Sequence, residues 1–177
     1  MYETRNDLPP KLRQVMSELL NTRLADAIDL RTRVKVAHWN VKGLNFIGLH
    51  ELLDDIAEAV DDYADLLGER IAQLGGIADG VASDVAEHSE LAAFVSPAWG
   101  DQQAQIGCVA SALADFVAGT RAAIKASEDA GDSVTSDILI DISRGTDKWL
   151  WFIEAHVQGL EARPGQGVHM SEQPLEH

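Results

Sequence analysis

Four long stretches of this chain place their apolar residues with the period of an α-helix. They run over residues from about 8 to 37, 46 to 74, 101 to 126 and 134 to 161. Helices of about 25 residues are each about 38 Å long, and helices of equal length pack naturally side by side. No alternating strand pattern competes with this period. The sequence therefore predicts an all-α fold, a four-helix bundle over residues 1–162.

Turn-forming residues separate the four stretches. Asp7 is a candidate helix cap and is followed by two prolines, which a helix accepts only in its first turn. The second stretch stops at Gly75 and Gly76. The link from there to the third stretch is long enough to cross over along the bundle, and its segment SDVAEHSELAAF is expected to hold a short helix. Residues 163–177 contain several Gly and Pro residues and predict a flexible C-terminal tail.

The charge balance limits the partners of the chain. Its 14 Lys and Arg residues stand against 29 Asp and Glu, for a formal net charge of -15. Nucleic acids and anionic membranes bind through basic side chains, so this excess of acid disfavours both and favours cations. The single cysteine, Cys108, rules out an intrachain disulfide and suits a reducing compartment. With no apolar N-terminal run and no membrane-spanning stretch, we expect a cytoplasmic protein without a membrane partner.

The stretch HELLDDIAEAVDDYADLLGE, from His50 to Glu69, carries eight carboxylates and one histidine in twenty residues. At about 100° per residue, its apolar positions share one arc of the helix. The opposite arc is an acidic stripe made up of His50, Asp54, Glu58, Asp61, Asp65 and Glu69. Such a stripe is most often a face in contact with water. A histidine one turn before an aspartate on the same stripe, however, can share a metal ion with it.

Two pairs of donors lie on the acidic stripe, His50 with Asp54 and Asp65 with Glu69, but about 16 Å of helix separates Asp54 from Asp65. One helix therefore cannot bring both pairs to one ion, whereas two antiparallel copies can. The register that places Asp54 opposite Asp65 also places His50 opposite Glu69, twice by symmetry, as an interface between identical subunits requires. Donors of this kind suit iron, and zinc is an alternative occupant. The Glu-x-x-His motif of bundles with a di-iron centre inside one chain is absent.

Several short motifs with fixed spacing resemble those of the Dps family, the mini-ferritins that are also called DNA-protecting proteins of starved cells. The resemblance extends over residues 8 to 162. It rests on GDSVTSDILIDISRGTDKWLWFIEAH in the last helical stretch and, before it, on His38-Trp39-Asn40, Gly43, Asn45-Phe46, His50-Glu51, Asp54, Asp65, Glu69-Arg70 and Leu74-Gly75-Gly76.

The resemblance implies a ferritin-like bundle, twelve copies of which form a hollow homo-oligomer, a dodecamer. In the family, Fe(II) is oxidised at sites shared between two subunits, with two irons per site. Hydrogen peroxide is preferred over dioxygen, and the ferric product is stored as a mineral. Carried over position by position, His38, His50 and Asp54 would come from one chain and Asp65 and Glu69 from its partner. His38, Asp65 and Glu69 would then act directly in a ferroxidase that protects the cell from oxidative damage.

Other residues are open to two interpretations. Trp39 is expected to pack beside the site, and the resemblance implies that it lies close enough to intercept stray oxidising equivalents there. Lys35, one turn earlier, is a surface lysine or a neighbour of the ligands. Asp132 is expected to cap the last helix. Asp137 and Asp141 are one turn apart near the start of that helix, where their charge suits the helix dipole; in the family this region forms a three-fold pore, in which such acids would draw in Fe(II).

A second function stays open, that of a DNA-compacting protein of the bacterial nucleoid with a minor role in iron oxidation. Family members that bind DNA usually carry a flexible terminus rich in Lys and Arg. Here the N-terminal segment offers only Arg5, Lys11 and Arg13, and the C-terminal tail offers only Arg163. We therefore expect DNA binding to be weak or absent.

Overall fold

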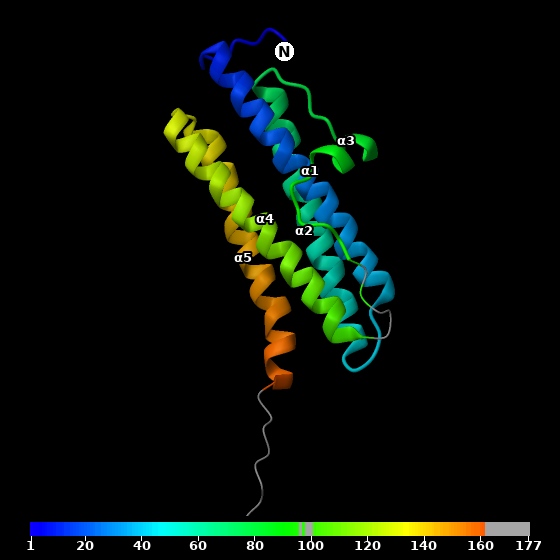
Figure 1. The fold of residues 1–177 in the computed structure, drawn as a ribbon. Coiled ribbons are helices and arrows are strands. Elements are labelled where there is room, and N and C mark those ends of the chain that lie inside the picture. Colours follow the sequence, from blue (N-terminus) through cyan, green and yellow to red (C-terminus); the bar gives the residue numbers. More distant parts are fainter. Residues whose placement is uncertain (96, 98–100, 162–177) are drawn as a thin grey trace, which may run out of the picture.

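The computed structural model describes residues 1–95, 97 and 101–161. Within them the helices are α1 Pro10–Asn40, α2 Phe46–Gln73, α3 Ala82–His88, α4 Gln102–Ala130 and α5 Ser133–Glu161. The four long helices lie side by side, and the short α3 packs against α1 (Figure 1). The predicted all-α bundle is confirmed, including a short helix between the second and third long helices. The tail predicted at residues 163–177 lies outside the described residues.

The bundle is built from two helical hairpins. α1 packs mainly on α2, α4 packs mainly on α5, and contacts between α1 and α4 join the two pairs. α2 ends at the opposite end of the bundle from the start of α4, so the connection between them runs along the bundle (Figure 1). Burial of apolar side chains between the hairpins drives this arrangement; those that are almost completely buried include Met16, Leu20, Leu30, Leu53, Ile56, Leu67, Leu113, Phe116 and Leu139.

The helix ends differ from the predicted ones in three places. α1 is preceded by Pro9 and has no side-chain cap, so the prediction that Asp7 caps it is wrong. The prolines set the start of the helix themselves, because their backbone already has a helical φ. At its other end α1 runs about one turn further than predicted, since no glycine or proline interrupts it before Gly43. α4 likewise continues to Gly131, whose φ of 81° ends it in a conformation that favours glycine.

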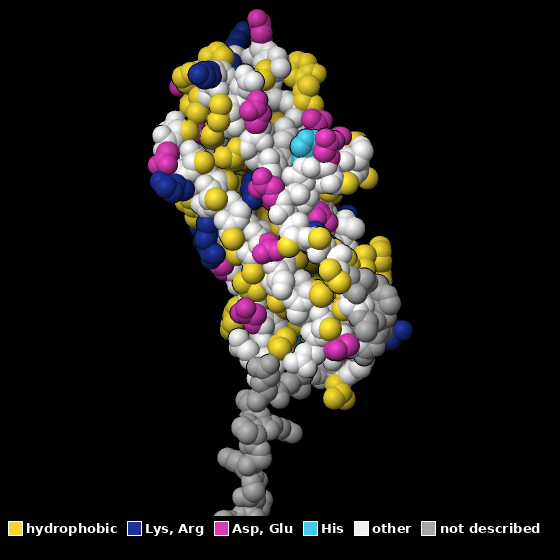
Figure 2. Space-filling model, viewed as in Figure 1, with side chains coloured by type: hydrophobic (Ala, Val, Ile, Leu, Met, Phe, Trp, Pro, Cys, Tyr) yellow, Lys and Arg dark blue, Asp and Glu magenta, His cyan; other side chains and the backbone are white. Residues whose placement is uncertain are grey.

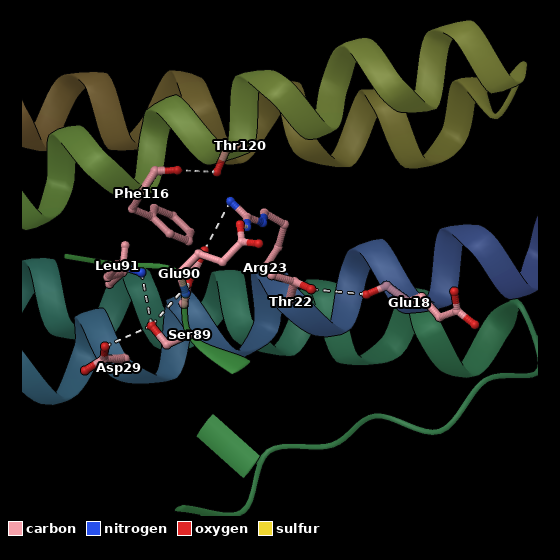
Figure 3. A network of polar contacts seen from close by, with 10 residues as sticks. Glu18, Thr22, Arg23, Asp29, Ser89, Glu90, Leu91, Phe116 and Thr120 are labelled. Atoms are coloured by element: carbon pink, nitrogen blue, oxygen red, sulfur yellow. Dashed lines mark hydrogen bonds and ion pairs between the residues drawn. The ribbon is translucent and has the colours of Figure 1, made fainter. Parts of the chain in front are cut away.

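Polar side chains fasten the connection between α2 and α4 to α1. Arg23 of α1 forms an ion pair with Glu90, and Ser89 Oγ donates a hydrogen bond of 2.9 Å to Asp29 (Figure 3). Asp26 accepts hydrogen bonds from Ser89 Oγ at 3.1 Å and from the backbone N–H of Glu90 at 2.7 Å. Burial raises the pKa of the Asp26 carboxyl, against the opposing effect of the nearby Arg23 guanidinium. These contacts fix the connection along the outside of α1.

The N-terminal segment is held against the end of α2. The backbone N–H of Tyr2 donates to the carbonyl of Gly75 at 2.7 Å, and Arg13 donates to the carbonyl of Leu74 at 3.0 Å. Gly75 has a φ of 82°, and a Cβ at this position would lie 2.6 Å from the carbonyl oxygen of Tyr2. Both the backbone conformation and the close contact therefore require glycine.

α4 is the one helix among the described residues that is long and apolar enough to cross a membrane by those two criteria, with a mean hydropathy of 1.2 in its most apolar window. Within the bundle, 44% of that window is buried, and Leu113 and Phe116 belong to the core. Packing against the other helices accounts for its apolar residues.

Candidate metal centre

His38 and His50 lie face to face where α1 ends and α2 begins. Their rings stack with 3.8 Å between centroids and 21° between planes. Nδ1 of His38 lies 2.8 Å from the carbonyl oxygen of His50, and Nδ1 of His50 lies 3.1 Å from the carbonyl oxygen of His38. A carbonyl can only accept a hydrogen bond, so each Nδ1 carries a proton, and the nitrogen left to bind a metal in each ring is Nε2. This is the tautomer in which a histidine binds a metal through Nε2, with its ring orientation fixed by the other nitrogen.

Asp54 lies one turn after His50 and is held by a lysine from α1. Nζ of Lys35 is 2.5 Å from Oδ1 of Asp54, and the Asp54 side chain remains 56% exposed. The hydrogen bond from Lys35 lowers the pKa of the Asp54 carboxyl, so Asp54 is ionised at neutral pH. Of the two interpretations of Lys35, the contact favours the one in which it neighbours a predicted ligand.

Asp65 and Glu69 lie further along α2, in an open groove of about 700 Å³ between α1, α2 and the start of the connection. Leu24 and Ile28 of α1 line the groove together with small residues of α2. Both carboxylates are exposed. Neither forms an ion pair with any residue that the structure describes. Their negative charge is therefore not balanced within one copy.

A stripe on α1 accompanies the acidic stripe of α2. Nε of Arg31 lies 2.8 Å from Oδ1 of Asp61, and Lys35 forms its ion pair one turn further along α1. In the other direction the same stripe continues with Ile28 and Leu24, which line the groove. α1 thus places one positive charge at the middle of the acidic stripe and one at its histidine end, and none at its far end. The 3- and 4-residue spacing of these α1 positions is a signal for this stripe that the sequence does contain.

Exposure along α2 follows the two predicted arcs. Every position of the acidic stripe is exposed or half-buried, and the apolar arc is buried or half-buried at Leu52, Leu53, Ile56, Val60, Tyr63 and Leu67. Among the described residues, no group of three or more His, Cys, Asp or Glu side chains is arranged to hold a metal ion. The five predicted ligands therefore do not come together in a single copy. His38, His50 and Asp54 lie at one end of α2, with Asp54 engaged by lysine, while Asp65 and Glu69 lie in the groove.

Several large apolar side chains between the two histidines in sequence are exposed. Trp39, directly after His38, is 68% exposed, and Leu44 and Ile47 in and after the α1–α2 connection are exposed as well. The ring of Phe46 lies 5.2 Å from that of His50. These exposed apolar side chains lie close in sequence to the metal donors, which makes them candidates for contact with another molecule.

The acids near the start of α5 have different surroundings. Asp137 lines a small surface hollow together with Glu128, Ser136 and Ile140. Asp141 is exposed and forms an ion pair of 2.8 Å with Arg144. The sequence interpretation did not single out Glu128, because it comes from the end of α4 and reaches this hollow only through the turn between the helices.

Asp132 caps α5, as predicted, because it accepts a hydrogen bond of 3.1 Å from the backbone N–H of Thr135. It is also buried and forms an ion pair of 2.8 Å with Arg70 of α2, whose Nε donates to Thr135 Oγ1 at 2.9 Å. This network joins the end of α2, next to Glu69, to the start of α5. Sequence reasoning missed it because the two charges are 62 positions apart.

Comparison with known proteins relates this arrangement to one family. The model of the Ferritin family, a ferritin-like domain, matches residues 17–162. The chain is 39% identical over 157 residues to the DNA protection during starvation protein of Agrobacterium fabrum, covering 89% of this chain and 96% of that protein. It is 34% identical to the protein of the same name from Mycolicibacterium smegmatis, over 87% of this chain and 81% of that one. Among solved structures, Mycobacterium smegmatis Dps matches with a TM-score of 0.84 and 30% identity, over 98% of both chains.

Proposed function

We propose that this chain, which belongs to the Dps family of ferritin-like proteins, oxidises Fe(II) at sites shared between two copies and stores the ferric product inside a shell of twelve copies. One observation carries the proposal: two histidines are fixed in the ligand tautomer beside an ionised aspartate. These donors do not complete a site within one copy. A second copy must then supply the rest.

The missing donors are the two carboxylates in the groove. When two copies of α2 run antiparallel about a two-fold axis, Asp65 and Glu69 of one copy face Asp54 and His50 of the other. The exposed apolar side chains beside His38 support this arrangement, because the second copy would cover them. Each pair of copies would hold two equivalent sites, each with two imidazoles and one carboxylate from one copy and two carboxylates from the other.

Imidazole nitrogen and carboxylate oxygen donors suit two Fe(II) ions at each site. Three carboxylates stabilise Fe(III) more than Fe(II), because the attraction grows with the charge of the ion. This favours the loss of one electron from each iron. One hydrogen peroxide takes up these two electrons and two protons and forms two molecules of water, so the reaction removes an oxidant as it stores iron. Zn(II) accepts the same donors and is expected to compete for the site.

Two neighbouring residues would modify the site without binding iron. Lys35 keeps Asp54 ionised and occupies it before metal arrives, so that iron entry replaces one cation by another. Trp39 is exposed directly after a ligand and can give up an electron to oxidant that escapes the iron. Both roles depend on the proposed metal site that two copies share.

Fe(II) must cross the wall of the shell to be stored inside it. Asp137 is exposed in the hollow near the start of α5, and three copies of it around a pore would attract cations. Asp141 would contribute less, because Arg144 already neutralises part of its charge.

DNA compaction is the second candidate function, and the names of the relatives as DNA protection proteins favour it. The charges of the described residues favour weak binding at most. Basic side chains are scattered singly among acidic ones on the face seen in Figure 2, and the first residues are held on the bundle through Tyr2. Each phosphate contact needs an uncommitted cation. Ion pairs already engage Arg23, Arg31, Arg33, Lys35, Arg70, Arg121, Lys125 and Arg144.

Fe(II) oxidation by the purified protein, followed by the absorbance of the ferric product, tests the proposal together with the mass of the assembly. We expect a large homo-oligomer that oxidises Fe(II) faster with hydrogen peroxide than with air. A monomer that leaves the spontaneous rate of oxidation unchanged would contradict the proposal. Gel retardation of duplex DNA at low and physiological salt tests the second function, and tight binding at physiological salt would support it.

A further inference from the structure

Arg31 lies at the middle of the acidic stripe and is only partly engaged. Its Nε is 2.8 Å from Oδ1 of Asp61, and the two side chains are 45% and 59% exposed. Among the described residues, Asp61 is its one ion-pair partner. A guanidinium presents five N–H donors in a planar fork, so it can hold two carboxylates at once. Arg31 therefore has donors left for a second acid.

The register of the shared site identifies this second acid. The pairing that places Asp54 opposite Asp65 also places Glu58 opposite Asp61, one turn closer to the two-fold axis. Glu58 is exposed and forms no ion pair within the described part of its own copy. Each pair of copies would then bring two Glu58 and two Asp61 side chains to the centre of the interface.

Four carboxylates at this centre need positive charge. Facing helices pack with their axes about 8–10 Å apart, so the acids would repel one another, and more strongly once water leaves the interface. The two copies of Arg31 bring two positive charges to the same place, already aligned by α1. A bound divalent cation is the other way to neutralise these acids, and it differs from Arg31 in being removed by a chelator.

We infer that Arg31 holds two copies of the chain in register by bridging its own Asp61 and the partner's Glu58. The inference rests on the proposed shared site, because it uses the same register. It adds that Arg31, which binds no iron, sets the register of the two α2 helices. Both iron sites of a pair depend on this register.

The register is tested separately with a thiol at the axis. In this register the two-fold axis passes between residues 59 and 60, and Asp62 is exposed one turn after Glu58, on the same side of α2. In Asp62→Cys with Cys108→Ser, the two thiols of a pair lie about 7.5 Å apart along the helix axis, and a short thiol-reactive linker should join them. Absence of this cross-link would overturn the register, and with it both the shared site and the role of Arg31.

A double-mutant cycle then tests the role of Arg31. Arg31→Ala and Glu58→Ala should each weaken association of the two copies about tenfold, measured by sedimentation, and the double variant should be no weaker than either single one. The loss should be larger at low salt than at high salt. Arg121→Ala is the matched control, because it breaks an exposed ion pair with Asp147, 55% and 46% exposed, on the other hairpin. This variant should associate through α2 as the parent does.

Each outcome separates the inference from the proposed function. If the cross-link forms but the two substitutions act additively or have no effect, the role of Arg31 is wrong and the shared site stands. If a chelator dissociates His38→Ala with His50→Ala, which lacks the histidine ligands of the iron sites, as far as Arg31→Ala dissociates, a bound cation holds the centre and the inference is again wrong. Iron oxidation by His38→Ala reports on the proposed function alone.

Discussion

The two ends of the acidic stripe on α2 carry similar donors in different surroundings. At the histidine end, α1 supplies a stacked imidazole and the lysine that holds Asp54, so each donor has a fixed partner. At the groove end, α1 supplies Leu24 and Ile28, which leave Asp65 and Glu69 without a balancing charge among the described residues. Together, α1 and α2 thus form a histidine end whose donors are already held in place and a groove end whose negative charge is unbalanced.

This difference divides two requirements of a metal site between the two ends. Donors held in place by other bonds need little reorganisation when the metal arrives. Carboxylates without a counter-charge gain most from a cation. A chain with both properties at one end could hold metal alone, whereas a chain that separates them completes its site only by pairing. In the proposed shared site, metal binding and the pairing of two copies would therefore support each other.

The histidine end is expected to be the more sensitive of the two. His38→Ala removes a ligand together with the ring on which His50 stacks, so the rate of Fe(II) oxidation should fall about 100-fold or more, while the mass of the assembly stays the same. Stopped-flow absorbance measures the rate. His156→Ala is the matched control, because Nδ1 of His156 also bonds to a backbone carbonyl, at 2.8 Å, but the residue belongs to α5 and is not a predicted ligand. Equal rates for the parent and His38→Ala would show that the histidine end does not take part in Fe(II) oxidation.

Removing charge at the groove end should have the next largest effect. In Asp65→Asn with Glu69→Gln the shape of the groove is kept and its free charge is lost, so metal affinity should fall about 30-fold. Titration calorimetry with zinc, at low and high salt, measures this. This loss of zinc affinity should be smaller at high salt, because salt screens the long-range attraction between the two carboxylates and the metal ion. The loss caused by His38→Ala should depend less on salt. Asp62→Asn changes another acid of the same groove and should matter little; an equal loss in this control would mean that only total charge counts.

Exchanging the counter-charge at the histidine end should have a smaller effect of opposite sign. Lys35→Met removes the cation that competes for Asp54, so zinc should bind about fivefold more tightly at neutral pH. The pKa of Asp54, which Lys35 lowers, should return to its ordinary range. On acidification, Asp54 of the metal-free variant should therefore take up its proton at a higher pH than Asp54 of the parent. Lys35→Arg keeps the charge and should resemble the parent; weaker binding by Lys35→Met would instead show that Lys35 mainly positions Asp54.

The contrast between free and balanced acids recurs on α5 and should give the smallest effect. Asp137→Asn should slow iron uptake about threefold at low salt, and Asp141→Asn should slow it less, because Arg144 already balances that charge. The rate of mineral growth inside the assembled protein measures uptake. If the double variant takes up iron at the parent rate, both aspartates serve only the start of the helix.

What could be predicted from the sequence depends on how near the interacting residues are along the chain. The helices, the two arcs of α2 and the donor pairs one turn apart follow from local periodicity, and the structure bears out the helices and the arcs. The cap at Asp7 was wrong because two neighbouring prolines decided the start of α1.

The features that escaped prediction depend on packing between helices. The reciprocal bonds between His38 and His50 require α1 and α2 to lie at one particular rotation. The pairs Arg31–Asp61 and Arg70–Asp132 join residues far apart in sequence. The periodicity of one helix does not determine which neighbouring helix packs against it, or how far the two helices are displaced along their axes.

The central claim, that each metal site belongs to two copies, is tested most directly by mixing two inactive variants. His38→Ala with His50→Ala lacks the histidine end, and Asp65→Ala with Glu69→Ala lacks the groove end. In a mixed pair, one site combines both defects and the other combines both intact ends. After joint reassembly of equal amounts with random pairing, Fe(II) oxidation should return to about a quarter of the parent rate, because half of the pairs are mixed and each has one intact site. A mixture that stays as inactive as its two components would show that each site lies within one chain.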